Sequence, residues 1–164
     1  MRMDSSILST DFINEVTKII LGWMNEKKIS EEILKSLVVK SNKKGECMAG
    51  LFIKTKDKLG SPELKGNLNG FHLYCSDPET TSTIVTEVLE HYGEEFITED
   101  FLGTKLNYDD ASFFQVNAVE FEKTLSVIGR FLSKSDEVLD FYCGVGAIGL
   151  PLSKYFNTGT LVES

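Results

Sequence analysis

The chain has 164 residues, of which 41% are hydrophobic and 26% charged. This is the balance of a globular protein with room for one ordinary domain, or for a small domain and part of another. No apolar run is long enough to cross a bilayer, and the first residues lack the apolar core of a secretion signal, so we expect no membrane contact and a cytoplasmic location.

The charge and the cysteines exclude further classes. A net charge of −8 argues against a stand-alone nucleic-acid binder, because phosphate contacts need clustered Lys and Arg. The lysines that do gather are Lys40, Lys43, Lys44, Lys54, Lys56 and Lys58. We interpret them as the solvated surface of a hairpin. The three cysteines are far apart and show no metal-ligand spacing with the two histidines, so we expect reduced thiols and no metal site.

The first half of the chain predicts a helix followed by strands. Apolar residues recur at helical spacing over residues 11–25, with Ser9 and Thr10 as candidate N-caps. Two apolar runs, Leu34–Val39 and Cys47–Ile53, flank turn residues and predict a β-hairpin.

The middle of the chain is less regular. Residues 55–69 hold glycines, a proline and lysines and predict a loop, whereas residues 71–75 predict a short strand. The segment 80–108 is ambiguous between helix and strand, with strand pieces expected at 96–97 and 105–106.

The pattern is clear again from Asn117, which fits a capping box with Glu120 and opens a predicted helix over residues 117–132. Glu137–Phe141 predicts a buried strand.

Residues 148–155 then predict a helix, and residues 160–163 begin a second strand. The order strand, glycine-rich turn, helix, strand is a single βαβ unit. A parallel sheet of two strands cannot cover both of its faces, so a complete domain would need more chain. We therefore expect either a fragment or a partner chain that supplies the rest.

The turn of this unit carries a ligand-binding motif. Residues 144–149, GVGAIG, match G-x-G-x-x-G between a strand and a helix, and Glu163 follows Gly144 by 19 positions. A carboxylate at that place can accept hydrogen bonds from ribose hydroxyls. Nicotinamide enzymes and class I methyltransferases both use this geometry. Asp140 favours the methyltransferases, because a carboxylate there would repel a pyrophosphate but suits the cationic, phosphate-free S-adenosylmethionine.

Two stretches together resemble the RNA 5-methyluridine (uracil-C5) methyltransferase family: SFFQVN at residues 112–117 and VLDFYCGVGAIGLPL at residues 138–152. Family members carry S-F-F-Q-x-N, then a helix, then V-L-D-h-Y-C-G-x-G-x-h-x-L, and the spacing matches here. The resemblance covers about residues 12–164. It implies an α/β fold in which residues 1–110 form a small α+β central region and residues 111–164 begin a Rossmann-like S-adenosylmethionine-binding domain, incomplete in this chain.

The resemblance also implies roles for single residues. Gln115, Tyr142 and Glu163 would contact S-adenosylmethionine, with Glu163 on the ribose hydroxyls, while Gly144 and Gly146 would shape the methionine side of the pocket. A polar Gln115 among apolar neighbours needs a partner, which agrees with that assignment.

The neighbouring Phe113 and Phe114 are interpreted as core packing.

In this family a Cys adds to C6 of a flipped-out uracil in tRNA or 23S rRNA, C5 takes the methyl group, and a carboxylate removes the C5 proton. Nucleophile and base lie downstream of the second strand in family members, so we expect no catalytic residue in this chain and no activity from it alone. Cys143 is assigned to the cofactor loop. Two alternatives stay open: a fragment of a small-molecule class I methyltransferase, and a non-catalytic module that needs a partner chain.

Overall fold

The computed structural model of the chain describes residues 6–163 and divides into two compact units. The first unit comprises residues 1–97 and 109–111, and the second comprises residues 98–108 and 112–164. The chain therefore leaves the first unit after Ile97, returns to it for three residues, and leaves it again at Ser112. The predicted domain division at residue 110 stays a prediction.

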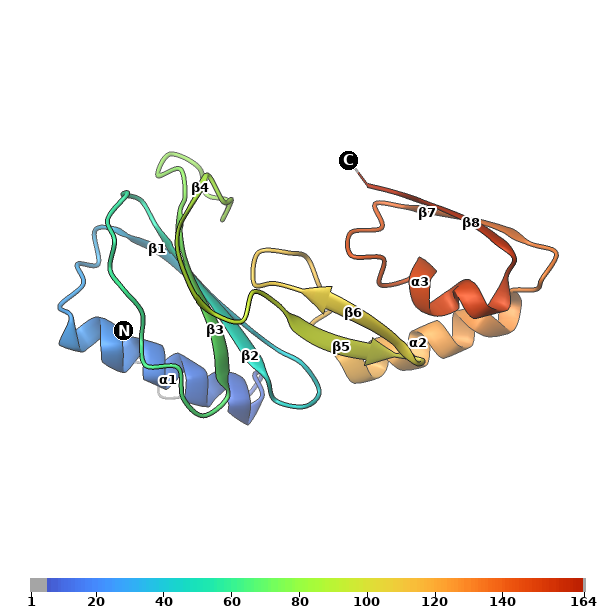
Figure 1. Cartoon of the computed structure of the whole chain (residues 1–164), viewed down its shortest axis with the longest axis horizontal. Coiled ribbons are helices and arrows are strands. Elements are labelled where there is room, and N and C mark those ends of the chain that lie inside the picture. Colours follow the sequence, from blue (N-terminus) through green and yellow to red (C-terminus); the bar gives the residue numbers. More distant parts are fainter. Residues whose placement is uncertain (1–5, 164) are drawn as a thin grey trace. The chain divides into compact units, whose positions relative to one another are not determined.

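The first unit is one helix on a four-stranded sheet (Figure 1). Its elements are α1 (Asp11–Glu26), β1 (Leu34–Ser41), β2 (Cys47–Ile53), β3 (Leu68–Cys75) and β4 (Glu87–Gly93).

The strands of this sheet lie in the order β1-β2-β3-β4, and only the β2–β3 pair is parallel. The predicted helix and hairpin are confirmed, and Thr10 is the N-cap, since its side chain accepts a hydrogen bond from the Ile13 amide. The ambiguous stretch 80–108 contains no helix: it begins as a loop and continues as strands from Glu87 onward.

The core of the first unit lies between α1 and one face of the sheet. Val16, Ile20 and Trp23 of the helix are buried against alternate residues of the two central strands, among them Leu51 and Leu73. This is the apolar stripe that the helical spacing predicts. Both central strands are buried over almost their whole length, so the residues of their other face are buried as well.

The second unit contains a hairpin, a helix and a βαβ unit. Its elements are β5 (Ile97–Phe101), β6 (Thr104–Tyr108), α2 (Ala118–Ile128) with a 3-10 turn (Gly129–Phe131), β7 (Glu137–Phe141), α3 (Gly149–Leu152) with a 3-10 turn (Ser153–Tyr155), and β8 (Thr158–Val162).

Strands β7 and β8 of this unit pair in parallel, which confirms the predicted βαβ topology. Asn117 caps α2 as predicted, since its Oδ1 accepts a hydrogen bond from the Glu120 amide at 3.1 Å.

Aromatic stacking joins the hairpin to the segment that precedes α2. The Phe114 ring lies parallel to the Tyr108 ring at 3.7 Å between centroids, and 5.7 Å from the ring of Phe101. Phe101 in turn meets Phe121 of α2 edge to face. The interpretation of Phe114 as a core residue is confirmed. Phe113 is 81% exposed, so the same interpretation of Phe113 is wrong.

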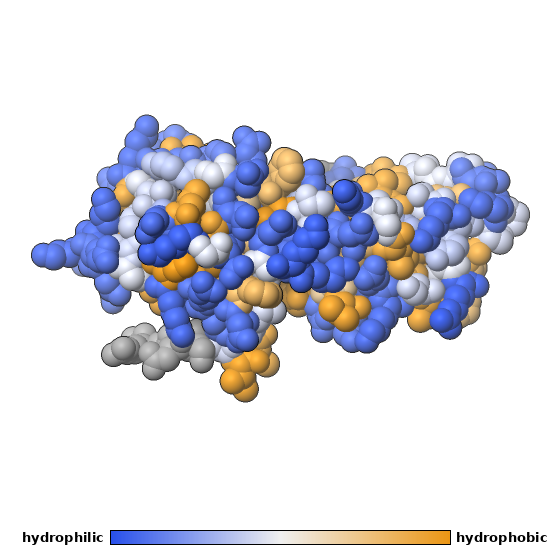
Figure 2. Space-filling view, turned by 60° about the horizontal axis from the view of Figure 1, so that its bottom comes forward, coloured by the Kyte–Doolittle hydropathy of each residue, from blue (hydrophilic) through white to orange (hydrophobic). Residues whose placement is uncertain are grey.

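The prediction that Glu137–Phe141 is a buried strand is also wrong. Exposed and half-buried residues alternate along β7, and every residue of β8 is exposed. A strand is fully buried only when layers pack on both of its faces, and two strands with one short helix do not provide them. Leu139, Phe141 and Val162 consequently reach the surface. Figure 2 shows apolar residues interrupting a mostly hydrophilic surface on one face of the molecule.

Candidate functional site

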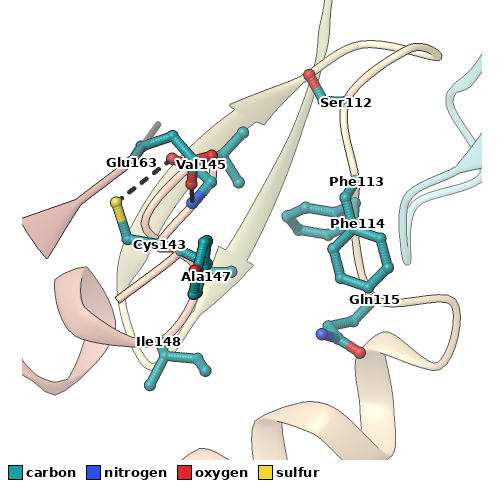
Figure 3. A pocket seen from close by; sticks show the side chains of 11 residues that line it. Ser112, Phe113, Phe114, Gln115, Cys143, Val145, Ala147, Ile148 and Glu163 are labelled. Carbon is teal, nitrogen blue, oxygen red and sulfur yellow. Dashed lines mark hydrogen bonds between the residues drawn. The ribbon is translucent and has the colours of Figure 1, made fainter. Parts of the chain in front are cut away.

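A pocket of about 560 Å³ lies in the second unit, within the size range of small-molecule sites. One side is Ser112–Gln115, the segment that leads from the hairpin into α2 (Figure 3). The other side is the loop after β7, with Glu163 beside it. Three segments that are distant in sequence therefore meet at one cavity, and all of them carry motif residues singled out above.

Four of the six predicted binding residues line this pocket. They are Gln115, Tyr142, Gly144 and Glu163. Gln115 is half-buried and faces the glycine loop across the cavity in Figure 3. Phe113 lines the same wall. The residue pattern carried no indication of its exposure, because an aromatic residue beside a buried one is usually part of the same core.

Glu163 is tied to the glycine loop. Its Oε2 accepts a hydrogen bond from the Gly144 amide at 2.7 Å, and the Cys143 amide donates to the Val162 carbonyl just before it. A carboxylate can accept about four hydrogen bonds, so one backbone amide leaves it the capacity to accept from vicinal hydroxyls. Glu163 thus stands at the cavity with its orientation fixed by the loop.

The loop adopts a backbone that few residues tolerate. Tyr142 has φ +59°, a left-handed conformation that costs a residue with a Cβ about 1–2 kcal/mol. Its side chain is 82% exposed and lines the pocket. Strain of this kind gathers at functional sites, where the surrounding structure holds it.

The two glycines of the motif differ in role. A Cβ on Gly144 would meet nothing within 4 Å, and Gly144 lines the cavity, so the absent side chain leaves space at the pocket. Gly146 is buried, and a Cβ there would lie 2.5 Å from Leu150 Cδ1. Both glycines have positive φ. Gly146 therefore allows the tight turn against α3, and it is not among the residues that line the pocket.

Asp140 also lies outside the pocket lining. Its Oδ2 accepts a hydrogen bond from the Gly149 amide at 2.9 Å, at the first residue of α3. The sequence predicted that this carboxylate faces a cationic ligand. In the structure, it instead contacts the backbone of the glycine loop. Asp140 and Glu163 together hold the two ends of the glycine loop.

The cysteines lie in different surroundings. Cys47 and Cys75 are buried in strands of the first unit, and burial, with Glu15 nearby, raises the pKa of the Cys47 thiol to about 11. Cys143 lines the pocket, and its thiol donates to the neighbouring Gly144 carbonyl at 3.8 Å. Within residues 6–163, no group of three or more His, Cys, Asp or Glu side chains is placed so that it could hold a metal ion.

Several of the clustered lysines are engaged in structural contacts. Lys54 donates to the Glu32 carbonyl, Lys56 pairs with Glu87 at 2.6 Å, and Lys40 donates to the Asp109 carbonyl. Lys54 and Lys56 are exposed, as expected of a solvated surface, whereas Lys40 is half-buried, so the interpretation of Lys40 as solvated is wrong. None of the helices in the described part of the chain has the length and hydrophobicity to span a bilayer.

Comparison with known proteins connects these features to an enzyme class. No protein-family model matches the chain. It is 30% identical over 166 residues to an RNA methyltransferase of Clostridium tetani, a match that covers 89% of this chain and 36% of that protein. An RNA methyltransferase of Caldanaerobacter subterraneus is 29% identical over 141 residues, or 78% of this chain and 31% of that protein. The resemblance to RNA methyltransferases is confirmed. The chain spans about a third of the length of these curated relatives.

A solved structure has the same fold. The tRNA (uracil-54, C5)-methyltransferase of Pyrococcus abyssi, determined with S-adenosyl-L-homocysteine, superimposes with a TM-score of 0.80 at 22% identity, over 94% of this chain and 41% of that one. The predicted fold class is confirmed: the chain has a mixed α/β fold that it shares with this structure over 94% of its length.

Proposed function

We propose that this chain is part of an S-adenosylmethionine-dependent methyltransferase of uracil C5 in tRNA or rRNA, and that the pocket of the second unit holds S-adenosylmethionine. The observation that carries the proposal is the meeting of the Ser112–Gln115 segment and the glycine loop at one cavity. A small-molecule methyltransferase would share the loop but has no need of that segment. The relatives are named for RNA and the P. abyssi enzyme for a tRNA uracil, which supports RNA and uracil as substrates.

The chemistry of the pocket fits a ligand without phosphate. Its lining consists of aromatic, aliphatic and small residues with Gln115 and Glu163 as its longer polar groups, and includes no Lys or Arg among the described residues. A dinucleotide places its pyrophosphate on amides at the start of the helix after the glycine turn. Here the first amide of α3, that of Gly149, already donates to Asp140. An anion is thus disfavoured and a cationic sulfonium is tolerated.

Bound S-adenosylmethionine would supply an electrophilic methyl group. In our proposal Glu163 accepts hydrogen bonds from the ribose hydroxyls, Gln115 contacts the cofactor from the opposite wall, and Tyr142 lies along it. Gly144 leaves room for close approach of the ligand, whereas Gly146 and Asp140 act indirectly by shaping the loop.

The exposed sheet supports the proposal that residues 111–164 are the start of a larger domain. Strands β7 and β8 present apolar side chains to solvent, and two parallel strands do not form a stable sheet by themselves. We propose that further strands and helices cover these two strands in the whole protein, and that those further parts carry the basic surface that binds RNA. We also propose that the whole protein acts in the cytoplasm.

Ligand binding tests the proposed function. By titration calorimetry, the 164-residue chain is expected to bind S-adenosylhomocysteine weakly and NAD not at all, because the three segments form only part of a cofactor pocket. Binding of NAD in place of S-adenosylhomocysteine would contradict the cofactor assignment. If neither ligand bound, the pocket would not be a cofactor site.

We further predict that the chain alone transfers no methyl group to RNA. Two of its cysteines are buried in the first unit, out of reach of an RNA base, and the raised pKa of the Cys47 thiol makes it a poor nucleophile as well. Cys143 belongs to the loop that we assign to the cofactor. A tritium-transfer assay with uridine-containing RNA should give background counts for the chain and for Cys143→Ser alike. Counts that copurify with the RNA and vanish in Cys143→Ser would instead make Cys143 the nucleophile.

A further inference from the structure

A buried carboxylate in the first unit plays no part in the pocket described above. It belongs to Asp110. Residues 109–111 are part of the first unit, although the residues before and after them, 98–108 and 112–164, belong to the second. The Asp110 side chain has no solvent exposure, and that of His72, its partner, is 8% exposed. Burying a carboxylate is costly unless hydrogen bonds replace its water, so this placement requires a built environment.

The partners of Asp110 come from the middle of β3. Its Oδ1 contacts Nδ1 of His72 and accepts a hydrogen bond from the Tyr74 hydroxyl at 3.4 Å. The two side chains share one hydrogen bond, in which the His72 nitrogen donates when the carboxylate is ionised. Burial and the nearby Asp110 charge raise the pKa of Tyr74, which keeps its hydroxyl protonated as a donor. Oδ2 of Asp110 has no hydrogen-bond partner in the described part of the chain.

The sheet is shaped to admit this carboxylate. In the paired register, Gly50 of β2 is next to His72, which is next to His91 of β4. A Cβ on Gly50 would lie 1.9 Å from Asp110 Oδ2 and 3.0 Å from Tyr74 Cε2. A glycine inside a fully buried strand is unfavourable by itself and marks close approach by another group. Here that group is the side chain of Asp110.

A second tie holds the same segment. Nζ of Lys40, in β1, donates to the Asp109 carbonyl at 3.0 Å. Loss of hydration lowers the pKa of Lys40, although Asp109 and Asp110 act to raise it. Side chains from β1 and β3 thus fasten two successive residues of a segment that has no regular secondary structure of its own.

We propose that Asp110 is a positioning residue for the pocket: by anchoring residues 109–111 in the first unit, it orders Ser112–Gln115, which begins directly after them. The proposal rests on the proposed function, because an ordered Ser112–Gln115 segment matters for ligand binding only if the pocket holds the cofactor. The proposal accounts for a buried carboxylate, one oxygen of which has no hydrogen-bond partner among the described residues. Such a group contributes little to the stability of a fold, but it can fix one conformation of the chain.

Hydrogen exchange in the ligand-free chain tests the anchor, because it does not depend on what the pocket binds. Asp110→Asn keeps the shape of the side chain and removes its charge. We expect amide exchange in residues 112–117 to become about tenfold faster, as for loss of a hydrogen bond to a charged group, while β2 and β3 keep their protection. His72→Leu should act alike. His72→Asn, whose amide offers a donor near the place of Nδ1, is the control and should restore most of the protection.

If amide exchange became equally faster throughout β2 and β3, Asp110 would only stabilise the core of the first unit, and the proposal would be wrong. Unchanged exchange in residues 112–117 would contradict it as well. Where wild type binds S-adenosylhomocysteine, Asp110→Asn should weaken that binding about tenfold. Unchanged affinity would refute the link to the pocket. If wild type binds no S-adenosylhomocysteine, the proposed function fails, and the exchange measurement still decides whether the anchor exists.

Discussion

Replacing Glu163 with alanine is expected to lower the affinity for S-adenosylhomocysteine ten- to a hundredfold. A hydrogen bond to a charged acceptor contributes about 1.5–3 kcal/mol, and about 1.4 kcal/mol corresponds to a factor of ten. The change also removes the acceptor for the Gly144 amide, so the loop loses its tie to the end of β8. Titration calorimetry on both proteins measures the effect.

Two further variants separate the causes. Glu163→Gln keeps an oxygen for the Gly144 amide but loses the charge, so it should fall between wild type and Glu163→Ala. Glu137→Ala removes an exposed carboxylate at the start of β7, outside the pocket, and should bind as wild type does. Tight binding that is indifferent to Glu163 would mean that the ribose contact has been misplaced.

The local signals of the sequence predicted much of the fold. Helical spacing and a capping side chain are properties of neighbouring residues, which is why α1 and the Asn117 cap could be predicted. The βαβ unit followed from a glycine motif between two element patterns. Segment 80–108 stayed ambiguous because β-branched residues at mixed spacing fit a helix or a strand equally well.

Burial in the second unit was harder to predict, since it depends on layers that a short pattern does not reveal. The apolar residues of β7, Val138, Leu139 and Phe141, were expected to be covered on both sides of the strand, yet Leu139 and Phe141 are exposed. For the same reason Phe113 was expected in the core beside Phe114. Gln115, Tyr142 and Glu163 could be placed at one pocket from the sequence, because they belong to motifs whose spacing is local. That they bind a ligand stays a prediction.

Asp110 was missed because its partner His72 is 38 positions away and no motif joins them. Two weak signals were present. Gly50 interrupts the apolar strand β2, and His72 interrupts the apolar stretch from Phe71 to Cys75; such interruptions mark close approach or a polar partner. Only the parallel register of β2 and β3 reveals that the two interruptions are adjacent.

Gly50→Ala is expected to destabilise the first unit by about 2–4 kcal/mol. Its methyl group would occupy the place of Asp110 Oδ2, so the carboxylate must leave His72 or the strands must separate. Overpacking a core costs about 1–3 kcal/mol, and leaving one member of a buried polar pair without its partner adds to that cost. The chain has a single tryptophan, Trp23, which is buried in this unit, so its fluorescence during urea unfolding reports the effect directly.

Gly22→Ala is the matched control for this experiment. Gly22 lies inside α1, where a Cβ would meet nothing within 4 Å, so alanine there should stabilise the same unit by about 0.5–1 kcal/mol through helix propensity. The same substitution should thus have opposite signs at two glycines of one unit. Were Gly50→Ala as stable as wild type, the space beside Gly50 would be free, and Asp110 could not be held there as we describe.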